Sequence, residues 1–323
     1  MKRFGEKHMF DILIIGKDSK YGLTKDSLLL EEAIRATGLP HVMGHADHKS
    51  RPFRERLLRT RRARIAIHIE RVYPAWYSAA DTHYLLPNQE RFPRRHLRRL
   101  RHVDLVLCKS RHAVDVFSRE GARTFHLGFT SEDRFSEAAP KDFSAFVHIA
   151  GASTLKGTEA VLAAWQAHPE WPELTLVMNA RLAPPTVPAN VRLISTYLSD
   201  EDMRTLQNAC GIHLCPSQAE GWGHYIVEAM STGAVVITTD APPMNELVDA
   251  GSGLLVKVAS STPRHLGTCF KVDQAALEAA IIEAMTMEAE RKADIGARAR
   301  AGFDAIREGF GERLQELLGS GAR

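Results

Sequence analysis

The chain has 323 residues, of which 44% are hydrophobic and 25% are charged, and its formal net charge is +3. At roughly 150 residues per domain this length predicts two domains, and the ordinary hydrophobic fraction excludes an intrinsically disordered protein. No run of residues approaches the roughly 20 apolar positions that a membrane-spanning helix requires. The charged residues at 1–8 do not resemble a secretory signal, and the four cysteines form no CxxC pair. We therefore expect a cytoplasmic protein without a transmembrane segment.

The positive charge is concentrated in one part of the chain. Between Arg51 and Arg111 there are 16 Lys and Arg residues against five Asp and Glu, a net charge of +11, which leaves −8 for the rest. Such a segment favours an anionic partner, which can be a nucleic acid, an acidic membrane surface or a phosphorylated substrate. It is equally typical of a solvated, arginine-rich helix face, so the composition leaves both interpretations open.

The first part of the chain alternates apolar runs with helical patterns. Residues 10–16 are typical of a buried strand, and residues 27–37 predict a helix. Residues 54–64 predict an amphipathic helix whose apolar face includes Phe53 and Leu57. The other expected elements are strands at 65–70, 84–90 and 103–108 and an Arg-rich helix at 93–101.

A second alternation follows an expected linker at 136–144. Strands that alternate with helices predict a parallel sheet in each half of the chain. We therefore expect an α/β fold of two doubly wound, Rossmann-like domains, over residues 1–138 and 139–323, facing a ligand-binding cleft. The expected elements are strands at 146–149, 174–178, 191–195, 212–215, 234–240 and 254–258 and helices at 158–168, 199–209 and 223–231. A helical tail to about 318, broken near Gly296, Gly302 and Gly311, completes the chain.

The most informative stretch is residues 213–237. A buried strand is followed by a loop with Gly221 and Gly223, which leads into a helix. Backbone N–H groups and the positive end of the helix dipole form an anion site at such a helix start. Glu220 and Glu228 are separated by seven residues, so both can face one ligand, and carboxylates suit sugar and ribose hydroxyls.

This stretch resembles the retaining glycosyltransferases of the GT-B fold, specifically glycosyltransferase family 4. Their C-terminal domains carry a Pro-Ser-x-x-Glu-Gly-Phe-Gly signature with a second Glu in Glu-Ala-Met. The resemblance covers most of residues 103–258, and it implies that Glu228 binds the ribose of a nucleotide-diphosphate sugar and Glu220 its sugar. The amides from Gly221 to His224 would bind the diphosphate. The matching residues are Pro216, Ser217, Glu220, Gly221, Trp222 (in place of Phe), Gly223, Glu228, Ala229, Met230 and Gly233.

A second loop agrees with the resemblance. The segment that begins at Gly151 resembles the Gly-Arg…Lys-Gly loop of the family, in which an arginine and a lysine neutralise the diphosphate. Lys156 matches the lysine, whereas Ala152 stands in place of the arginine. Arg181 or an arginine of the N-terminal domain would therefore supply the second positive charge. Tyr197 lies where the base-binding loop of the family begins.

The N-terminal domain offers further candidates. In related enzymes one of its strands ends in a His-containing turn that contacts the transferred sugar. The corresponding strand here ends at residues 86–90 with Asn-Gln-Glu and no histidine. Asn88 and Glu90 are therefore expected to contact the donor sugar or the acceptor hydroxyl. Glu70 is a weaker candidate, because it can pair with one of the many arginines.

The resemblance implies transfer on one face of the sugar, with the leaving diphosphate helping to deprotonate the acceptor. Catalysis then depends mainly on stabilising the charge that builds on the diphosphate, for which Lys156 and the helix amides are suited. No cofactor and no metal ion are expected. The DxD at 200–202 falls in the first turn of a helix, where acids suit the dipole, and the histidines at 41–48 match no metal signature.

Two acceptor classes fit the basic N-terminal domain, which generally holds the acceptor in GT-B enzymes. One is a modified base in duplex DNA, as in virus-type DNA glycosyltransferases, with the base flipped out of the helix. The other is a lipid-linked, lipopolysaccharide or polysaccharide acceptor at an anionic membrane surface. The dense arginine and the small apolar faces favour DNA slightly. The candidate acceptor-binding residues are Arg54, Arg61, Arg94, Arg95 and Arg98.

Functions from other classes remain alternatives. GT-B folds also include nucleotide-sugar epimerases and non-catalytic nucleotide-sugar binders, and a basic nucleic-acid-binding protein without catalysis is a further one. A transferase releases the nucleoside diphosphate, whereas an epimerase isomerises the donor. A protein that only binds nucleic acid would keep its activity after the substitution Glu228→Ala.

Overall fold

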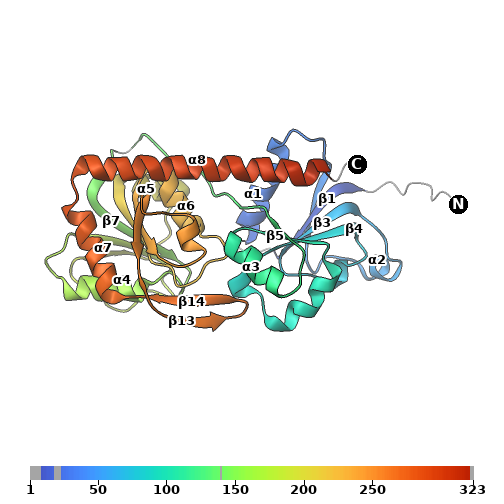
Figure 1. Cartoon of the computed structure of the whole chain (residues 1–323), viewed down its shortest axis with the longest axis horizontal. Coiled ribbons are helices and arrows are strands. Elements are labelled where there is room, and N and C mark those ends of the chain that lie inside the picture. The colour runs from blue at the N-terminus through green and yellow to red at the C-terminus, as the bar shows by residue number, and fades with distance from the viewer. Residues whose placement is uncertain (1–8, 18–22, 139, 321–323) are drawn as a thin grey trace. The chain divides into compact units, whose positions relative to one another are not determined.

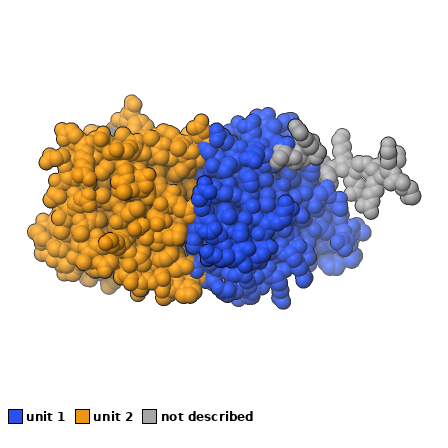
Figure 2. All heavy atoms as spheres, viewed as in Figure 1, with its two compact units in different colours: residues 1–129, 265–267, 309–323 blue, residues 130–264, 268–308 orange. Residues whose placement is uncertain are grey.

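The computed structural model describes residues 9–17, 23–138 and 140–320, and it divides into two compact units (Figure 2). Unit 1 consists of residues 1–129, 265–267 and 309–323, and unit 2 of residues 130–264 and 268–308. The first division lies nine residues before the expected domain boundary, because residues 131–136 hydrogen-bond to helices of unit 2. The last part of the chain belongs to unit 1, where the expected boundaries placed it in the C-terminal domain.

Unit 1 contains a six-stranded parallel sheet in the order β2-β1-β3-β4-β5-β6. The strand order reverses between β1 and β3, which is the doubly wound pattern. Ile12, Leu13, Ile14 and Ile15 are at most 1% exposed, because both faces of the sheet are covered. The elements are β1 (Phe10–Gly16), α1 (Leu23–Ala36), β2 (Met43–Asp47), α2 (Phe53–Leu57), β3 (Ala63–Glu70), η1 (Pro74–Trp76), β4 (Ala80–Pro87), η2 (Gln89–Arg91), η3 (Arg94–His102), β5 (Leu105–Cys108), α3 (Arg111–Arg119) and β6 (Thr124–His126).

The region before β3 differs from the sequence prediction. Residues 43–47 form the edge strand β2, which pairs with β1, although no strand was expected there. The helix expected over 54–64 is confined to the five residues of α2, because Arg59 has a φ of 53° and β3 already begins at Ala63. Its apolar face is not packed, since α2 has no buried residue. The Arg-rich helix is the 3₁₀ helix η3.

Unit 2 contains a second six-stranded parallel sheet, in the order β12-β11-β10-β7-β8-β9. Its core includes Phe146, Trp165 and Trp171, whose rings meet edge to face at centroid distances of 5.6 and 5.2 Å. The predicted α/β class with two doubly wound, Rossmann-like sheets is therefore confirmed (Figure 1). The elements are β7 (Asp142–Gly151), α4 (Thr158–Ala167), β8 (Leu174–Met178), β9 (Val191–Ile194), α5 (Asp200–Ala209), β10 (Cys210–Cys215), α6 (His224–Ser231), β11 (Val235–Thr239), η4 (Met244–Glu246) and β12 (Gly253–Val256).

The C-terminal part differs from the expected pattern in two ways. β13 (Val258–Arg264) and β14 (Gly267–Val272) form a two-stranded sheet, which the sequence did not indicate because β13 consists mostly of exposed polar residues. After α7 (Gln274–Thr286), α8 (Ala289–Ser320) is one helix of 32 residues, unbroken by its glycines (Figure 1). A Cβ on Gly296 would lie 2.2 Å from the carbonyl oxygen of Gly233, so this glycine permits a close backbone approach.

Three buried histidines make the free energy of unfolding depend on pH. Burial lowers the pKa of His68 to about 3 and the pKa values of His148 and His213 to about 4. The unfolded chain binds protons at these side chains near their ordinary pKa, about 6.5, and the folded chain only below about pH 4. Stability is therefore fully present above about pH 6.5 and is lost as the pH falls toward about 4.

We accordingly expect the free energy of unfolding, measured by urea titration, to be lower at about pH 5 than at about pH 7.5, by on the order of a few kcal/mol. The substitution His148→Asn removes one of the buried imidazoles, so this variant should show a shallower pH dependence. An unfolding free energy that is constant or rises between about pH 7.5 and about pH 5 would contradict the assignment of neutral buried histidines.

Candidate active site

The loop after β10 leads directly into α6. All six residues of β10 are buried, which fixes the end of the strand in the sheet. Gly223 precedes the helix with a φ of 106°, and an added Cβ would lie 3.1 Å from Leu247 Cδ1, so the position favours glycine. α6 begins at His224, and the first amide groups of a helix have no partner within it. Residues 216–223 thus bring a helix N-terminus to the carboxyl end of the sheet.

A second loop, which follows β7, packs on this one. Lys156 Nζ lies 2.6 Å from Glu220 Oε1, and the two side chains are 16% and 12% exposed. The backbones also meet, because a Cβ on Gly157 would lie 2.1 Å from the carbonyl oxygen of Pro216. The structure therefore joins in one ion pair two residues that the sequence assigned to a common site from separate loops.

Ser217 and Tyr225 complete this arrangement. Ser217 Oγ donates a hydrogen bond to Glu220 Oε1 at 2.5 Å, and it lies 2.6 Å from the hydroxyl oxygen of Tyr225. Because a serine hydroxyl has one proton, Tyr225 is the donor in the second bond. The Lys156 ammonium lies 3.7 Å from the centroid of the Tyr225 ring, a cation–π contact. Burial raises the pKa of Tyr225 well above its usual value, so the hydroxyl remains protonated.

Tyr225 contacts the candidate site residues Ser217 and Lys156, and it was not among the residues expected from the sequence. The available signal was an aromatic residue in the first turn of the helix, which by itself is typical of a core position. The charges around the end of β10 point to the same grouping. Burial raises the pKa of the Cys215 thiol, and the charges of Lys156, Glu220 and Glu228 all act on that thiol. These three charged groups therefore lie around one strand end.

The other predicted donor residues are placed as follows. Gly151 ends β7 with a φ of 55°, and its carbonyl oxygen accepts a hydrogen bond of 2.8 Å from the amide of Asn179. Gly221 and Trp222 are buried in the loop before α6. Tyr197 follows β9, and its side chain is 92% exposed.

Ser131 fixes the start of α6 from another direction. Its Oγ lies 2.8 Å from His224 Nδ1 and accepts a hydrogen bond of 3.3 Å from Trp222 Nε1. Ser131 is buried and belongs to unit 2. The segment at 131–136 therefore supports the loop whose backbone is expected to bind the donor.

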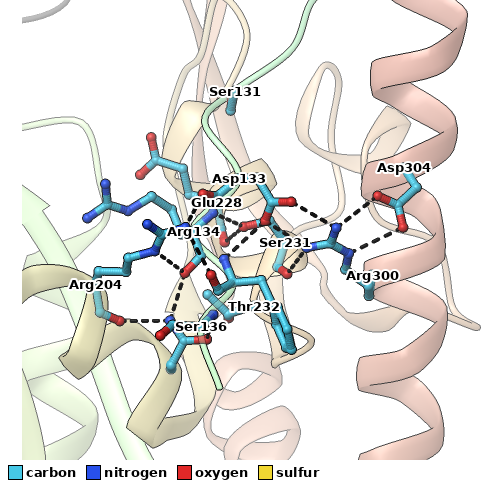
Figure 3. Close-up of polar contacts among 12 residues, drawn as sticks. Ser131, Asp133, Arg134, Ser136, Arg204, Glu228, Ser231, Thr232, Arg300 and Asp304 are labelled. Carbon is cyan, nitrogen blue, oxygen red and sulfur yellow. Dashed lines mark hydrogen bonds and ion pairs between the residues drawn. The ribbon is translucent and has the colours of Figure 1, made fainter. Parts of the chain in front are cut away.

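A polar network holds this segment in place (Figure 3). Arg134 Nε donates to Gln207 Oε1 on α5 at 2.9 Å, and the amide of Arg134 donates to Ser231 Oγ on α6 at 2.9 Å. Arg300 on α8 forms a bidentate pair with Asp133, at 2.7 and 2.8 Å. Bidentate arginine–carboxylate pairs fix geometry as well as charge. Three helices of unit 2 thus anchor the residues that follow Ser131.

In unit 1, the two predicted contact residues have structural partners. Lys109 Nζ donates to Asn88 Oδ1 at 3.0 Å and pairs with Asp26 Oδ2 at 2.6 Å, and both charged groups are buried. Glu90 is 7% exposed at its side chain, and its Oε1 lies 3.6 Å from Arg91 Nε. Asn88 therefore lies at a buried ion pair, and Glu90 lies below the surface of the unit.

Glu70, the weaker candidate, ends β3 in an unusual conformation. It is a buried residue with a φ of 65°, a region that non-glycine residues rarely adopt. Its Oε1 lies 3.7 Å from Arg71 Nη2. The alternative role expected for it, pairing with an arginine, is thus present in the structure.

The predicted acceptor-binding arginines all lie on the surface of unit 1. Two of them form ion pairs, Arg61 with Asp81 and Arg94 with Glu120, the latter at 3.7 Å. Ion pairs of this exposed kind contribute little to stability. The exposed residues are Arg54, Arg61, Arg94, Arg95 and Arg98.

The described residues contain no metal-binding group. Among residues 9–17, 23–138 and 140–320, no three His, Cys, Asp or Glu side chains are arranged to hold an ion. Asp200 and Asp202 of the DxD lie in the first turn of α5, where the amide of Asp202 donates to the N-cap Ser199. Asp200 also pairs with Arg134 at 2.7 Å. In that same part of the chain, no helix is long and apolar enough to cross a membrane.

Comparisons with known proteins point to one family. Residues 187–302, which include Glu220 and Glu228, match the sequence model of the family described as Glycosyl transferases group 1. None of the curated proteins that were compared matches significantly.

Several solved structures are similar to most of the chain. HepE of Anabaena in complex with UDP-glucose has a TM-score of 0.70 at 17% identity, over 96% of this chain and 100% of that chain. Sucrose-phosphate synthase of Thermosynechococcus elongatus has a TM-score of 0.68 at 15% identity, over 96% and 98%. A chain of the GtfA/B complex has a TM-score of 0.57 at 15% identity, over 79% of this chain, which spans 57% of that chain.

At these identities the structural likeness shows the fold, and the family match shows the kind of domain that contains the α6 loop. Together with the two Rossmann-like sheets, they show a GT-B fold in which residues 187–302 match the Glycosyl transferases group 1 family.

Proposed function

We propose that the α6 loop of unit 2 binds a nucleotide-diphosphate sugar and that the protein transfers the sugar with retention of configuration. The observation that carries this proposal is the contact of Lys156 with Glu220, 2.6 Å apart at the N-terminus of α6. A cation, a carboxylate and the first amides of a helix then lie together, as a ligand that is part phosphate and part sugar requires. HepE, whose structure holds UDP-glucose, supports this choice of ligand by its similar fold.

The charges of the groups around the α6 loop indicate which part of the donor each would bind. The amides from Gly221 to His224 and the Lys156 ammonium would bind the diphosphate, Glu220 the hydroxyls of the sugar, and Glu228 those of the ribose. Lys156 pairs with Glu220 in the structure. The diphosphate would therefore have to share the Lys156 ammonium with the Glu220 carboxylate or displace that carboxylate from it. Donor binding thereby frees Glu220 oxygens to accept hydrogen bonds from sugar hydroxyls.

Transfer needs charge stabilisation more than a separate base. The bond between the anomeric carbon and the diphosphate oxygen breaks as the acceptor oxygen bonds to that carbon, and the acceptor proton passes to the leaving diphosphate. Lys156 and the α6 amides would stabilise the negative charge that builds on that leaving group. We propose that no metal ion takes part, because these cationic and dipolar groups occupy its role.

For the acceptor we propose a molecule that is anionic or lies on an anionic surface. The exposed arginines of unit 1 support this proposal, and Arg54, Arg95 and Arg98 are examples. A modified base in duplex DNA and a lipid-linked or polysaccharide acceptor at a membrane both meet the condition. We further propose a cytoplasmic location, because the four cysteines are free thiols, which suits a reducing compartment.

A panel of nucleotide sugars tests the donor function. We expect the protein to release the nucleoside diphosphate from one of them, at an unchanged rate when EDTA is added. Glu228→Gln should lose this activity, since the amide no longer accepts hydrogen bonds from two ribose hydroxyls as a carboxylate does. An isomerised donor without release would instead favour the epimerase alternative. Full retention of nucleic-acid binding with no donor turnover would favour a non-catalytic binder.

A further inference from the structure

Three large apolar side chains stand exposed among arginines in one short segment of unit 1. Phe53, Leu57 and Leu58 are 72%, 69% and 75% exposed. Single exposed apolar residues are ordinary on protein surfaces, whereas three of them in one short, arginine-rich segment indicate a binding surface. Residues 53–59, which contain α2 and the turn after it, are called the α2 patch below.

The base of the patch is firmly packed. Arg51 is 5% exposed and donates hydrogen bonds of 2.7 and 2.8 Å to two backbone carbonyl oxygens. Arg62 forms a bidentate pair with Glu55, at 2.7 and 2.5 Å. The guanidinium groups of Arg51 and Arg62 lie 5.6 and 5.9 Å from the ring of Trp76, which is fully buried. The exposure of the apolar side chains is therefore not the result of a loosely attached segment.

The same contacts leave the patch positively charged. Glu55, the one acidic residue between 53 and 59, is neutralised by Arg62. Arg54, Arg56 and Arg59 are exposed, and within the described chain no acidic side chain lies at ion-pair distance from them. The α2 patch thus presents three cations beside three apolar side chains.

The combination of cations and apolar side chains in the α2 patch fits an anionic lipid bilayer better than a nucleic-acid duplex. Peripheral attachment to a bilayer uses apolar side chains that enter the acyl boundary and cations that meet anionic headgroups. The phosphates of a duplex would satisfy the arginines and would leave the phenylalanine and leucines in water. We propose that the α2 patch docks unit 1 on the surface of an anionic lipid bilayer. The proposal is independent of the donor assignment, because the patch and the α6 loop belong to different units.

Vesicle flotation with the full-length protein tests the proposal. We expect binding to vesicles that contain phosphatidylglycerol and much weaker binding to vesicles of phosphatidylcholine alone. The triple substitution Phe53→Ser, Leu57→Ser and Leu58→Ser should lower the partition coefficient at least about tenfold, because each side chain loses apolar burial. The pair Arg54→Gln and Arg56→Gln should lower it about tenfold and remove most of the headgroup preference.

A matched control removes apolar side chains elsewhere in unit 1. Leu28 and Val42 are 59% and 58% exposed, and Leu28→Ser with Val42→Ser should leave vesicle binding unchanged. All the substituted side chains are exposed, so the thermal midpoint of each variant should match that of the parent chain. The arginine pair, which changes no apolar packing, keeps the test valid if the triple variant folds poorly.

Two results would overturn the proposal. One is vesicle binding that the triple substitution does not change. The other is tight binding of a short DNA duplex that the arginine pair weakens and the apolar substitutions leave intact, with a steep loss as salt is raised. The second result would assign the α2 patch to nucleic acid and return the acceptor question to duplex DNA.

Discussion

Replacing Lys156 by alanine is expected to lower the rate of sugar transfer by about 10²–10³-fold, the loss typical for removal of one group that stabilises an oxyanion. Lys156 is a cation at the α6 loop, and Ala152 stands where the family has a second one. The remaining stabilisation would come from the helix amides and from the arginine that is expected to replace that second cation. The measurement is release of the nucleoside diphosphate at saturating donor, together with the donor dissociation constant.

The control variant for this prediction keeps the positive charge at position 156 and changes the shape of the group that carries it. Lys156→Arg should retain more activity than Lys156→Ala, although the planar guanidinium fits the ring of Tyr225 differently from an ammonium group. Equal rates for the alanine variant and the parent protein would show that Lys156 does not contact the leaving group. The Lys156–Glu220 pair would then have only a structural role.

Tyr225 is expected to act through Lys156. Tyr225→Leu removes the aromatic face that lies 3.7 Å from the ammonium, and it should weaken donor binding roughly tenfold. Tyr225→Phe keeps the ring and should restore most of that affinity, while losing the hydrogen bond to Ser217. If the phenylalanine and leucine variants bind donor equally well, the ring does not position Lys156. Donor affinity is measured by calorimetry. If only the loss of the hydroxyl mattered, the two variants would bind the donor equally weakly.

The largest stability effect is expected at Lys109. Lys109→Met removes one member of a buried ion pair and leaves the Asp26 carboxylate without the ammonium that lies 2.6 Å away. Removing one partner of such a pair typically lowers the free energy of unfolding by about 3–5 kcal/mol, because the remaining charge is costly to bury. Urea unfolding of the full-length chain at neutral pH provides the measurement.

A double variant separates the cost of the unpaired charge from the other effects of replacing Lys109. Asp26→Asn combined with Lys109→Met removes both charges, and it should be clearly more stable than Lys109→Met alone. A loss of less than about 1 kcal/mol in the single variant would mean that the carboxylate is solvated or protonated at little cost. Asn88→Ala should have a smaller effect than Lys109→Met, since it removes one of the hydrogen bonds of Lys109.

Local motifs were the most predictable part of the molecule. The strand, glycine loop and helix around Glu220 follow one another within about two dozen residues, and each is fixed by short-range chemistry: an apolar run, a positive φ at Gly223 and a helix start. Lys156 and Glu220 were expected at one donor site from the resemblance of both loops to one family, whereas the ion pair between them was not expected. Tyr225 could not be anticipated, because its role depends on a neighbour 69 positions earlier in the chain.

Elements at the margins of the sheets were the least predictable. β2 is an edge strand with a single fully buried position, so it lacks the apolar run by which the central strands are found. The α2 segment has the spacing of an amphipathic helix, and yet Phe53 and Leu57 are exposed. Periodicity indicates which side chains share a face of a helix, and it does not show whether any other element covers that face.

The glycines of α8 illustrate a different limit. In isolation they indicate breaks, because glycine disfavours a helix by about 1 kcal/mol relative to alanine. Gly296 lies against the backbone of Gly233 instead, which brings two segments of unit 2 closer than a side chain would allow. A contact of this kind can be found only once the tertiary structure is known.

The path of α8 has a consequence for synthesis on the ribosome. Its last residues complete unit 1, where the ring of Phe310 lies 5.2 Å from that of Phe129 and Arg313 Nε donates to the carbonyl oxygen of Leu127. The part of unit 1 that precedes residue 130 therefore lacks part of its core until the end of α8 has been translated. All residues of unit 2 are translated before the residues of unit 1 that begin at 309. Unit 2 can therefore fold first, and unit 1 completes its fold last.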